Sequence, residues 1–194
     1  MDPPRADQPP VRERADAARN RARVLAAAAR LFSQQDGRTV TMEQIAAAAG
    51  VGKATLYRRY PDVASVAVAL LDEHERALQG EIMRGPPPLG PGASPSQRLA
   101  AFYRAMVDLL ERHGHLALAA ETGPRRYQTG AYQAWALHVR TLLTRAGLDH
   151  QPALVDALLA PLAPDVFAHQ RANGLTPAQI AGALATLARR TLAG

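Results

Sequence analysis

The segment of residues 41–60, TMEQIAAAAGVGKATLYRRY, constrains the fold more than any other part of the chain. Thr41 followed by Gln44 has the spacing of a capping box, which predicts that a helix begins directly after Thr41. Gly50 predicts the end of that helix, because glycine adopts the left-handed conformation without a Cβ clash. A second short helix is predicted to start near Gly52. The segment therefore predicts two helices joined by a tight turn.

The second of these helices is expected to have one apolar and one polar face. Leu56 and Tyr60 are spaced to lie on the face that packs inward. The opposite face of this helix carries cations and hydroxyls and contains no acid, which suits a helix that enters the major groove of DNA. An ordinary surface hairpin of helices with solvated charges is the alternative. The predicted DNA contacts are Thr41, Lys53, Ala54, Thr55, Tyr57, Arg58, Arg59 and Tyr60.

The sequence AGVGKATLYRRYPD is similar to the AGVSxGTLYxHFxxK segment of the tetracycline-repressor (TetR) family of bacterial transcription regulators. The preceding VLAAAARLFSQQD resembles the first helix of that family, and the resemblance covers about Arg19 to Pro61. Gly52 departs from the pattern, because the family usually has a serine cap there. Val63 departs as well, because the family usually has a lysine that contacts phosphate. Arg58 or Arg59 could replace that lysine.

Charge is distributed unevenly along the chain. The net charge is +6, and the residues before Val63 hold 11 basic and 7 acidic side chains, a net +4. This asymmetry is typical of a protein that binds phosphates with one end. No cysteine is present, which excludes disulfides and thiolate metal sites, and no metal or cofactor site is predicted. The start of the chain has no apolar signal segment and no run has membrane-spanning length, so we expect a cytoplasmic protein without a membrane partner.

The helical patterns predict an all-α fold in three parts. Residues 1–16 are proline-rich and are expected to form a mobile arm, either a solvated tail or a basic arm that reaches a minor groove. Residues 17–61 are expected to form a three-helix helix-turn-helix DNA-binding domain. Residues 62–194 are expected to form a helical domain for ligand binding and dimerisation.

Within the second domain, start and stop signals predict the individual helices. One runs from Pro61 to about Met83, and a loop follows over residues 85–96. A capping box at Ser94 opens a helix to about His113, and a separate short helix is expected over residues 115–121. The remaining predicted helices are Gly130–Ala146, one from Pro152 that Pro161 and Pro164 kink or split, and one from the capping box at Thr176.

No combination of residues in the chain predicts catalysis. Motifs of zinc hydrolases, phosphate-cradling loops and nucleophile elbows are absent. His113 and His115 have a spacing that points the two rings to different faces of a helix, which disfavours a metal site with Glu111 or Glu121. Tyr127 beside two arginines suggests a DNA-cleaving nucleophile, but no further arginine–histidine set follows it. We therefore expect no enzyme, with a DNA-processing enzyme as the alternative of a different class.

Aromatic side chains gather in the second domain and converge by helical spacing. They predict either an ordinary core or an apolar effector cavity with a few polar groups, and the family resemblance favours the cavity. The candidate pocket residues are Phe102, Tyr103, Met106, Tyr132, Trp135 and His138.

The last two helical regions carry apolar stripes, and the resemblance implies that they pair in a homodimer. The candidate interface residues are Leu154, Leu158, Leu162, Ile180, Leu184 and Leu187. The resemblance also implies a regulator, usually a repressor, that leaves a palindromic operator in double-stranded DNA when a small effector binds. A constitutive DNA-binding protein whose second domain only dimerises remains the closer alternative.

Overall fold

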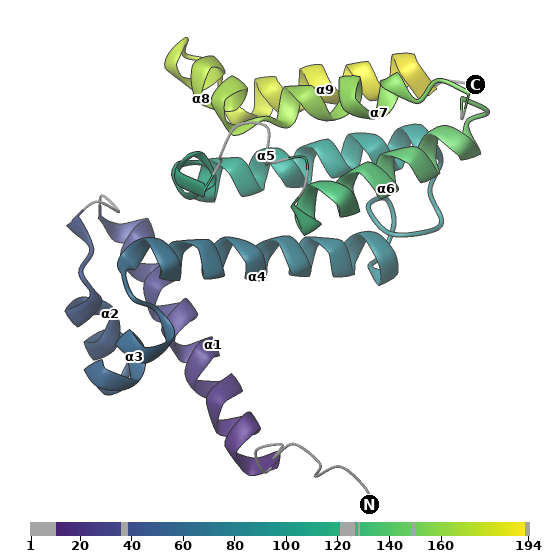
Figure 1. Ribbon diagram of the computed structural model, residues 1–194. Helices are drawn as coiled ribbons and strands as arrows, with labels where there is room; N and C mark the ends of the chain where they lie inside the picture. Colours follow the sequence, from purple (N-terminus) through teal and green to yellow (C-terminus); the bar gives the residue numbers. More distant parts are fainter. Residues whose placement is uncertain (1–10, 36–38, 121–126, 128, 149, 193–194) are drawn as a thin grey trace, which may run out of the picture. The chain divides into compact units, whose positions relative to one another are not determined.

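The computed structural model describes residues 11–35, 39–120, 127, 129–148 and 150–192, and every regular element in these ranges is a helix (Figure 1). The predicted all-α class is therefore confirmed. The chain divides into two compact units, Met1–Leu70 and Leu71–Gly194. The sequence placed the domain boundary after Pro61, whereas the two units meet inside a helix.

The first unit is a three-helix arrangement extended by the start of a fourth helix. Its helices are α1 (Val11–Gln34), α2 (Met42–Ala49), α3 (Lys53–Arg59) and the part of α4 (Val63–Arg84) that ends at Leu70. α1 contacts α2, and α2 contacts α3. The buried side chains of this unit include Val24, Leu25, Ala28, Val40, Ile45, Leu56 and Val66.

The predicted arm of residues 1–16 is wrong for its second part, because α1 begins at Val11. Residues 1–10 lie outside the described ranges. The segment RERADAAR that follows Val11 consists largely of arginine, glutamate and alanine, which have high helix propensity. Arg19 forms an ion pair with Asp16 at helical spacing, which adds local support. The prediction from proline and charge content therefore extended the arm too far, because it included residues 11–16, which belong to α1.

α4 starts two residues later than its proline. Asp62 caps the helix, because its Oδ1 accepts a hydrogen bond of 2.7 Å from the backbone N–H of Ser65. The hydrogen bonds from Ser65 lower the pKa of the Asp62 carboxyl. Arg21 of α1 donates to the carbonyl of Ala69 at 3.4 Å, and Val66 is fully buried. The first turns of α4 therefore belong to the DNA-binding unit, which moves the boundary beyond Pro61.

The second unit is organised around one long helix, α5, which contacts α6, α8 and α9 (Figure 1). The side chains Leu78 and Ile82 of α4 belong to the same hydrophobic core. No helix in the described ranges combines the length and the apolarity needed to cross a bilayer. The elements of this unit after α4 are α5 (Pro95–Ala120), α6 (Gly130–Arg145), α7 (Ala153–Leu159), η3 (Ala160–Leu162), α8 (Pro164–Ala172) and α9 (Pro177–Leu192).

Start and stop signals of the second unit act as predicted, with one exception. The backbone N–H of Gln97 donates to Ser94 Oγ at 3.3 Å, and the backbone N–H of Ser94 donates to Gln97 Oε1 at 3.1 Å. The prolines 161 and 164 divide the region into α7, η3 and α8. The predicted break near His113 is wrong, because α5 continues through Gly114 to Ala120. A single glycine inside a long helix lowers its stability without ending it.

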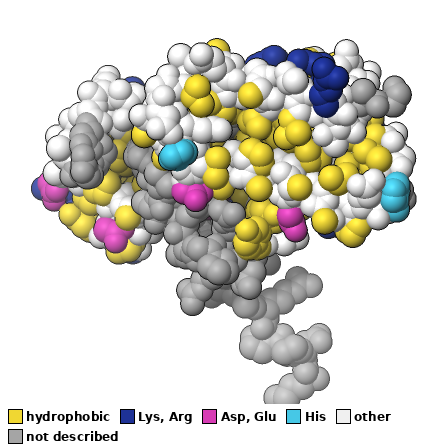
Figure 2. Space-filling view, turned by 90° about the horizontal axis from the view of Figure 1, so that it is seen from above, with side chains coloured by type: hydrophobic (Ala, Val, Ile, Leu, Met, Phe, Trp, Pro, Cys, Tyr) yellow, Lys and Arg dark blue, Asp and Glu magenta, His cyan; other side chains and the backbone are white. Residues whose placement is uncertain are grey.

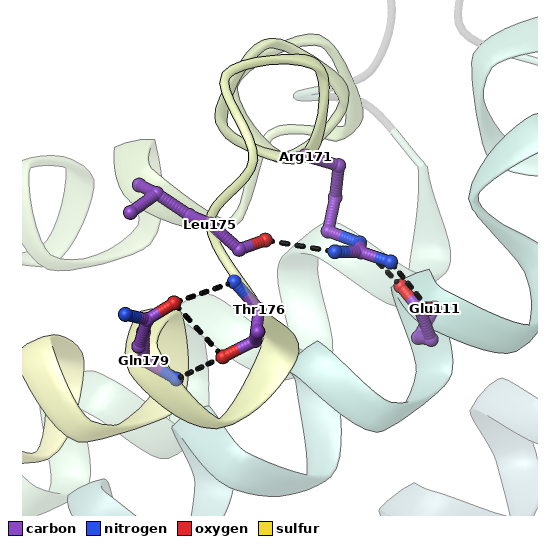
Figure 3. Close-up of polar contacts among 5 residues, drawn as sticks. All are labelled: Glu111, Arg171, Leu175, Thr176 and Gln179. Atoms are coloured by element: carbon purple, nitrogen blue, oxygen red, sulfur yellow. Dashed lines mark hydrogen bonds and ion pairs between the residues drawn. The ribbon is translucent and has the colours of Figure 1, made fainter.

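An arginine clamp joins α5, α8 and the turn before α9 (Figure 3). Arg171 donates to both carboxylate oxygens of Glu111 at 3.0 Å and to the carbonyl of Leu175 at 2.8 Å. The capping box of α9 follows directly, because the backbone N–H of Gln179 donates to Thr176 Oγ1 at 3.2 Å. Glu111 thus pairs with a cation, and no cluster of three metal-ligating side chains occurs among the described residues.

Candidate nucleic-acid interface and effector region

The turn between α2 and α3 is held at both of its ends. Thr41 Oγ1 accepts from the backbone N–H of Gln44 at 3.2 Å, and Gln44 Oε1 accepts from the backbone N–H of Thr41 at 2.9 Å. Gly50 has a φ of +61°, and its N–H donates to the carbonyl of Ala47 at 3.1 Å. The predicted capping box and glycine stop are therefore both present, and they fix where α3 begins.

Two arginines of α1 stabilise the end of α2, a role that the sequence did not reveal. Arg23 Nη2 donates to the carbonyl of Gly50 at 2.8 Å, and Arg30 Nη2 donates to the carbonyl of Ala48 at 3.4 Å. The last carbonyls of a helix lack partners within the helix and carry partial negative charge, so guanidinium groups suit them. A Cβ atom on residue 50 would lie 2.6 Å from Arg23 Nη2. Glycine is therefore favoured at this turn by its positive φ, and a larger residue would also displace the end of the Arg23 side chain from its bond to the Gly50 carbonyl.

α3 has the two faces that the sequence predicted. Leu56 is 2 % exposed and faces the interior. Gly52 precedes the helix without a side-chain cap, as expected from the missing serine. The predicted contact residues Thr41, Lys53, Ala54, Thr55, Tyr57, Arg58 and Arg59 are all exposed. Their contact with DNA stays a prediction.

Tyr60 is an exception, and its assignment as a DNA contact is wrong. The residue is 5 % exposed, and its hydroxyl accepts a hydrogen bond of 3.2 Å from Arg21 Nη1. The i, i+4 spacing from Leu56 already placed both side chains on the inward face. Tyr60 therefore anchors the end of α3 in the core of the unit.

Glu43 of α2 brings a negative charge to the polar face of α3. Its Oε1 lies 3.8 Å from Lys53 Nζ and accepts a hydrogen bond of 3.3 Å from the hydroxyl of Tyr57. Desolvation and the Glu43 carboxylate raise the pKa of the Tyr57 phenol. The prediction of a face without acids was based on the residues of α3 alone. The structure shows that α2 supplies one.

Three of the six candidate pocket residues, Phe102, Trp135 and His138, have neighbouring rings in the second unit. The ring of Phe102 lies 5.7 Å from that of Trp135 and 5.2 Å from that of His138. Phe102, Tyr103, Met106, Trp135 and His138 are buried, and Tyr132 is partly buried. Whether they enclose a cavity or only form a core stays a prediction.

Two of the polar groups expected to orient an effector already have partners in the protein. The hydroxyl of Tyr103 donates to the carbonyl of Leu158 at 2.9 Å, and burial raises the pKa of this phenol. The hydroxyl of Tyr132 donates to Asp156 Oδ1 at 2.6 Å. These two bonds tie α5 and α6 to α7 and stabilise the packing of this region.

The predicted dimer interface is wrong for most of its residues. Within the single chain, the interior residues are Leu158, Leu162, Ile180 and Leu184, at 3 %, 6 %, 4 % and 7 % exposed. Leu154 is partly buried, and only Leu187, at 38 % exposed, lies on the surface. An apolar stripe identifies the face of a helix that is buried, but it does not identify what covers that face. Here the same chain covers it.

Comparison with known families identifies the first unit. Residues 24–70 match the model of the family described as bacterial regulatory proteins, tetR family. An uncharacterised HTH-type transcriptional regulator of Mycobacterium tuberculosis strain H37Rv is 43 % identical over 61 residues, or 31 % of this chain and 30 % of the relative. A methylthioribose-1-phosphate isomerase of a Synechococcus species is 32 % identical over 113 residues, or 58 % of this chain and 30 % of that enzyme. These alignments therefore span under a third of each curated relative.

Solved structures resemble the chain over nearly its full length. A TetR-like transcriptional regulator from Rhodococcus sp. RHA1 has a TM-score of 0.58 and 20 % identity, covering 90 % of this chain and 96 % of its own. A second TetR-family regulator from a Rhodococcus species has a TM-score of 0.64 and 15 % identity, covering 90 % and 99 %. At this level of identity the likeness shows the fold alone.

Proposed function

The chain belongs to the TetR family through its N-terminal domain, and we propose that it is a homodimeric repressor of transcription that leaves its operator when a small effector binds. The observation that carries the proposal is the exposed cationic face of α3. This face is presented by a turn that the capping box of α2, Gly50 and Arg23 hold in place. A rigid support is what base recognition requires, because small displacements remove hydrogen bonds to base edges.

The comparisons favour a transcription regulator over an enzyme. The matched family consists of regulatory proteins, and the structures that cover 90 % of the chain are those of transcription regulators. The similarity to the isomerase covers 30 % of that enzyme, and the described residues hold no cluster of three or more metal-ligating side chains. These comparisons support a regulator rather than an enzyme.

The operator is expected to be a pseudo-palindromic sequence of double-stranded DNA, with α3 of each subunit in its major groove. One short helix contacts few base pairs, so two symmetric copies are needed for useful specificity. Lys53 and Thr55 are the candidates for contact with base edges. The candidates for contact with phosphates or bases are Tyr57, Arg58 and Arg59. Such a protein acts on the nucleoid in the cytoplasm.

The outward faces of α7, α8 and α9 are the best support for a homodimer. Figure 2 shows hydrophobic side chains spread over this face, with few charged groups among them. Leu187 of α9 is 38 % exposed, and Leu175 in the turn between α8 and α9 is 39 % exposed. The exposed small residues that let a second helix approach closely are Ala153, Ala157, Ala178, Gly182 and Ala183. This surface replaces the interface that the sequence suggested.

α4 is the element that could transmit effector binding. It is one continuous helix from Val63 to Arg84, with its first turns in the DNA-binding unit and the side chains of Leu78 and Ile82 in the core of the second unit. An effector that binds one orientation of α4 more tightly shifts the population toward that orientation and changes operator affinity. A constitutive DNA-binding protein would lack this response. A thermal-shift screen against small molecules, followed by operator binding, distinguishes the two.

The DNA-binding proposal is tested by selecting bound sequences from a random duplex library and measuring affinity for the selected operator. Lys53→Ala should weaken binding by roughly 1–3 kcal/mol if Lys53 contacts a base edge, and it should relax preference at one position. Loss of a phosphate contact alone would lower affinity evenly and make the salt dependence shallower. Arg104→Ala removes an exposed cation of α5 and is the matched control. Unchanged affinity of both Lys53→Ala and Tyr57→Ala would refute the assignment of α3.

A further inference from the structure

Arg98 is a buried cation without a carboxylate partner. It lies near the start of α5 and is 5 % exposed. Its Nε donates to the carbonyl of Leu89 at 3.2 Å, and its Nη2 donates to the carbonyl of Ile82 at 2.9 Å. A guanidinium has five N–H donors, so these two bonds leave three. Within the described part of the chain no acid pairs with Arg98.

The groups that face Arg98 are basic as well. Burial and the charge of Arg145, at the end of α6, lower the pKa of Arg98. His138 of α6 is 7 % exposed, and its Nε2 is buried without a hydrogen-bond partner among the described residues. Burial, and then the charge of Arg98, lower the pKa of His138 to about 4, so its ring is neutral at pH 7. Arg145 is exposed and positive, His138 is buried and neutral, and among the described residues no acid pairs with Arg98.

Capping of α4 explains only part of this arrangement. Ile82 lies in the last turn of α4, where carbonyls lack helical partners and attract a cation. That role uses the Nη2 bond, and the Leu89 carbonyl uses Nε. It does not account for the buried Nε2 of His138, which has no hydrogen-bond partner among the described residues, and it uses two of the five N–H donors of Arg98. Burying a charge without a counter-ion is strongly unfavourable unless a partner is present in the working state.

The basic groups and the aromatic cluster form one continuous strip on α5 and α6. Arg98 and Phe102 are four residues apart and share a face of α5. On α6, Trp135, His138 and Arg145 are separated by three and seven residues and also share a face. The rings of His138 and Trp135 both lie within 6 Å of Phe102, at 5.2 Å and 5.7 Å. The strip is therefore cationic at one end and aromatic along its length.

We propose that the effector of this protein is an apolar molecule with a single carboxylate. Its carboxylate binds the free donors of Arg98 and accepts a second hydrogen bond from His138 Nε2, and its apolar body lies against Phe102 and Trp135. Guanidinium is the side chain best shaped to bind a carboxylate through two bonds. A neutral apolar ligand would leave the buried charge unpaired. The inference rests on the proposed ligand-responsive function and assigns the class of ligand for that site.

The experiment compares acids with their neutral counterparts on the intact protein. The probes are 4-phenylbutyrate and dodecanoate against 4-phenylbutyramide and dodecanamide, with binding followed by the emission of Trp135, the single tryptophan of the chain. We expect at least one acid to change this emission saturably and to bind at least about tenfold more tightly than its amide, as expected for a charged hydrogen-bonded pair. The same acid should weaken operator binding over the same concentration range.

Four variants test whether Arg98 and His138 cause the preference for acids over amides. Arg98→Met should bring acid and amide to equal affinity, Arg98→Lys should keep the acid preference in part, and Arg104→Met, on the exposed face of α5, should leave it unchanged. His138→Leu should narrow the preference while Arg98 stays intact, so the test holds even if Arg98→Met does not fold.

Three results would overturn the inference: no acid binds, amides bind as tightly as acids, or Arg98→Met retains the preference. Operator binding by the wild-type protein is measured separately. Operator binding without acid preference refutes only the ligand class, and acid preference without operator binding refutes only the proposed function.

Discussion

The two compact units use basic side chains in different ways. In the first unit, Arg23 and Arg30 donate to carbonyls at the end of α2, and the cations of α3 are exposed to solvent. In the second unit, Arg98 lies inside the fold and two of its five donors are used. An exposed cation is solvated until a polyanion approaches, and it serves many sequences through phosphate contacts. A buried cation can bind only a partner that fits the space around it. The proposed roles of the basic residues therefore differ, with DNA binding in the first unit and ligand selection in the second.

The largest expected effect concerns the boundary between core and surface in the second unit. Leu158→Arg combined with Leu184→Arg places two charges in the interior and should unfold this unit, with a loss of at least about 4 kcal/mol. Leu187→Arg changes an exposed residue of α9 and should keep the fold while converting dimers to monomers. Circular dichroism during denaturation and sedimentation velocity measure the two outcomes. A folded monomeric double variant would restore the interface that the sequence suggested.

The next effect concerns pH and is confined to the second unit. The folded-state pKa of His138 is about 4, below the usual value of 6.5, so the unfolded state binds more protons between these values. Stability contributed by the neutral ring is fully present above pH 6.5 and is lost as the pH falls toward 4. For the contribution of His138 alone we expect a loss of about 1–3 kcal/mol over this range. Glu75 acts in the opposite direction, because burial raises the pKa of its carboxyl to about 7, so the comparison with a His138 variant isolates the effect of the imidazole. In His138→Leu the loss should be smaller. Equal acid sensitivity of both proteins would show that other groups dominate.

The third effect concerns the arginine that holds the recognition turn. Arg23→Ala removes the hydrogen bond to the carbonyl of Gly50 and should lower the stability of the first unit by about 1 kcal/mol. Arg19→Ala removes an exposed ion pair of the same helix and should change stability by less than about 0.5 kcal/mol. Urea denaturation of both variants gives the comparison. Equal effects would mean that the contact with Gly50 adds nothing beyond surface charge.

The smallest effect concerns the acid on the DNA-binding face. Glu43→Gln frees Lys53 from its ion pair, so operator affinity should rise by about 0.5–1 kcal/mol and its salt dependence should become steeper. Glu81→Gln makes the same charge change on an exposed residue of α4 in the second unit and should have no effect. Affinities measured at several salt concentrations decide the matter. Weaker binding of Glu43→Gln at one base pair only would show that Glu43 itself accepts a hydrogen bond from DNA.

The sequence identified features whose causes are local. The capping boxes at Thr41, Ser94 and Thr176, the stop at Gly50 and the division at Pro161 all depend on residues within one or two turns. Their physics is contained in short windows: a side chain bonds to a nearby amide, or a residue permits or forbids a backbone angle. The fold class and the position of the recognition helix could therefore be predicted without coordinates.

Local signals failed where the outcome depended on distant partners. Tyr60 was assigned both to the core and to DNA, and only its burial beside Arg21 decided for the core. Gly114 looked like a helix end, but α5 continues through it within the packed second unit. The stripes containing Leu158 and Leu184 were correctly read as buried faces, yet they were assigned to the wrong partner.

The sequence by itself determined where the helices begin and end, which faces are apolar, and which short helix carries the cations. Only the tertiary structure decided that Glu43 neutralises part of that helix, that Arg23 holds its turn, and that Arg98 is buried beside His138. Secondary structure follows from interactions between near neighbours in the chain, which a sequence displays directly. The state of a charge depends on which distant groups approach it and whether water reaches it, and only the packed chain determines both.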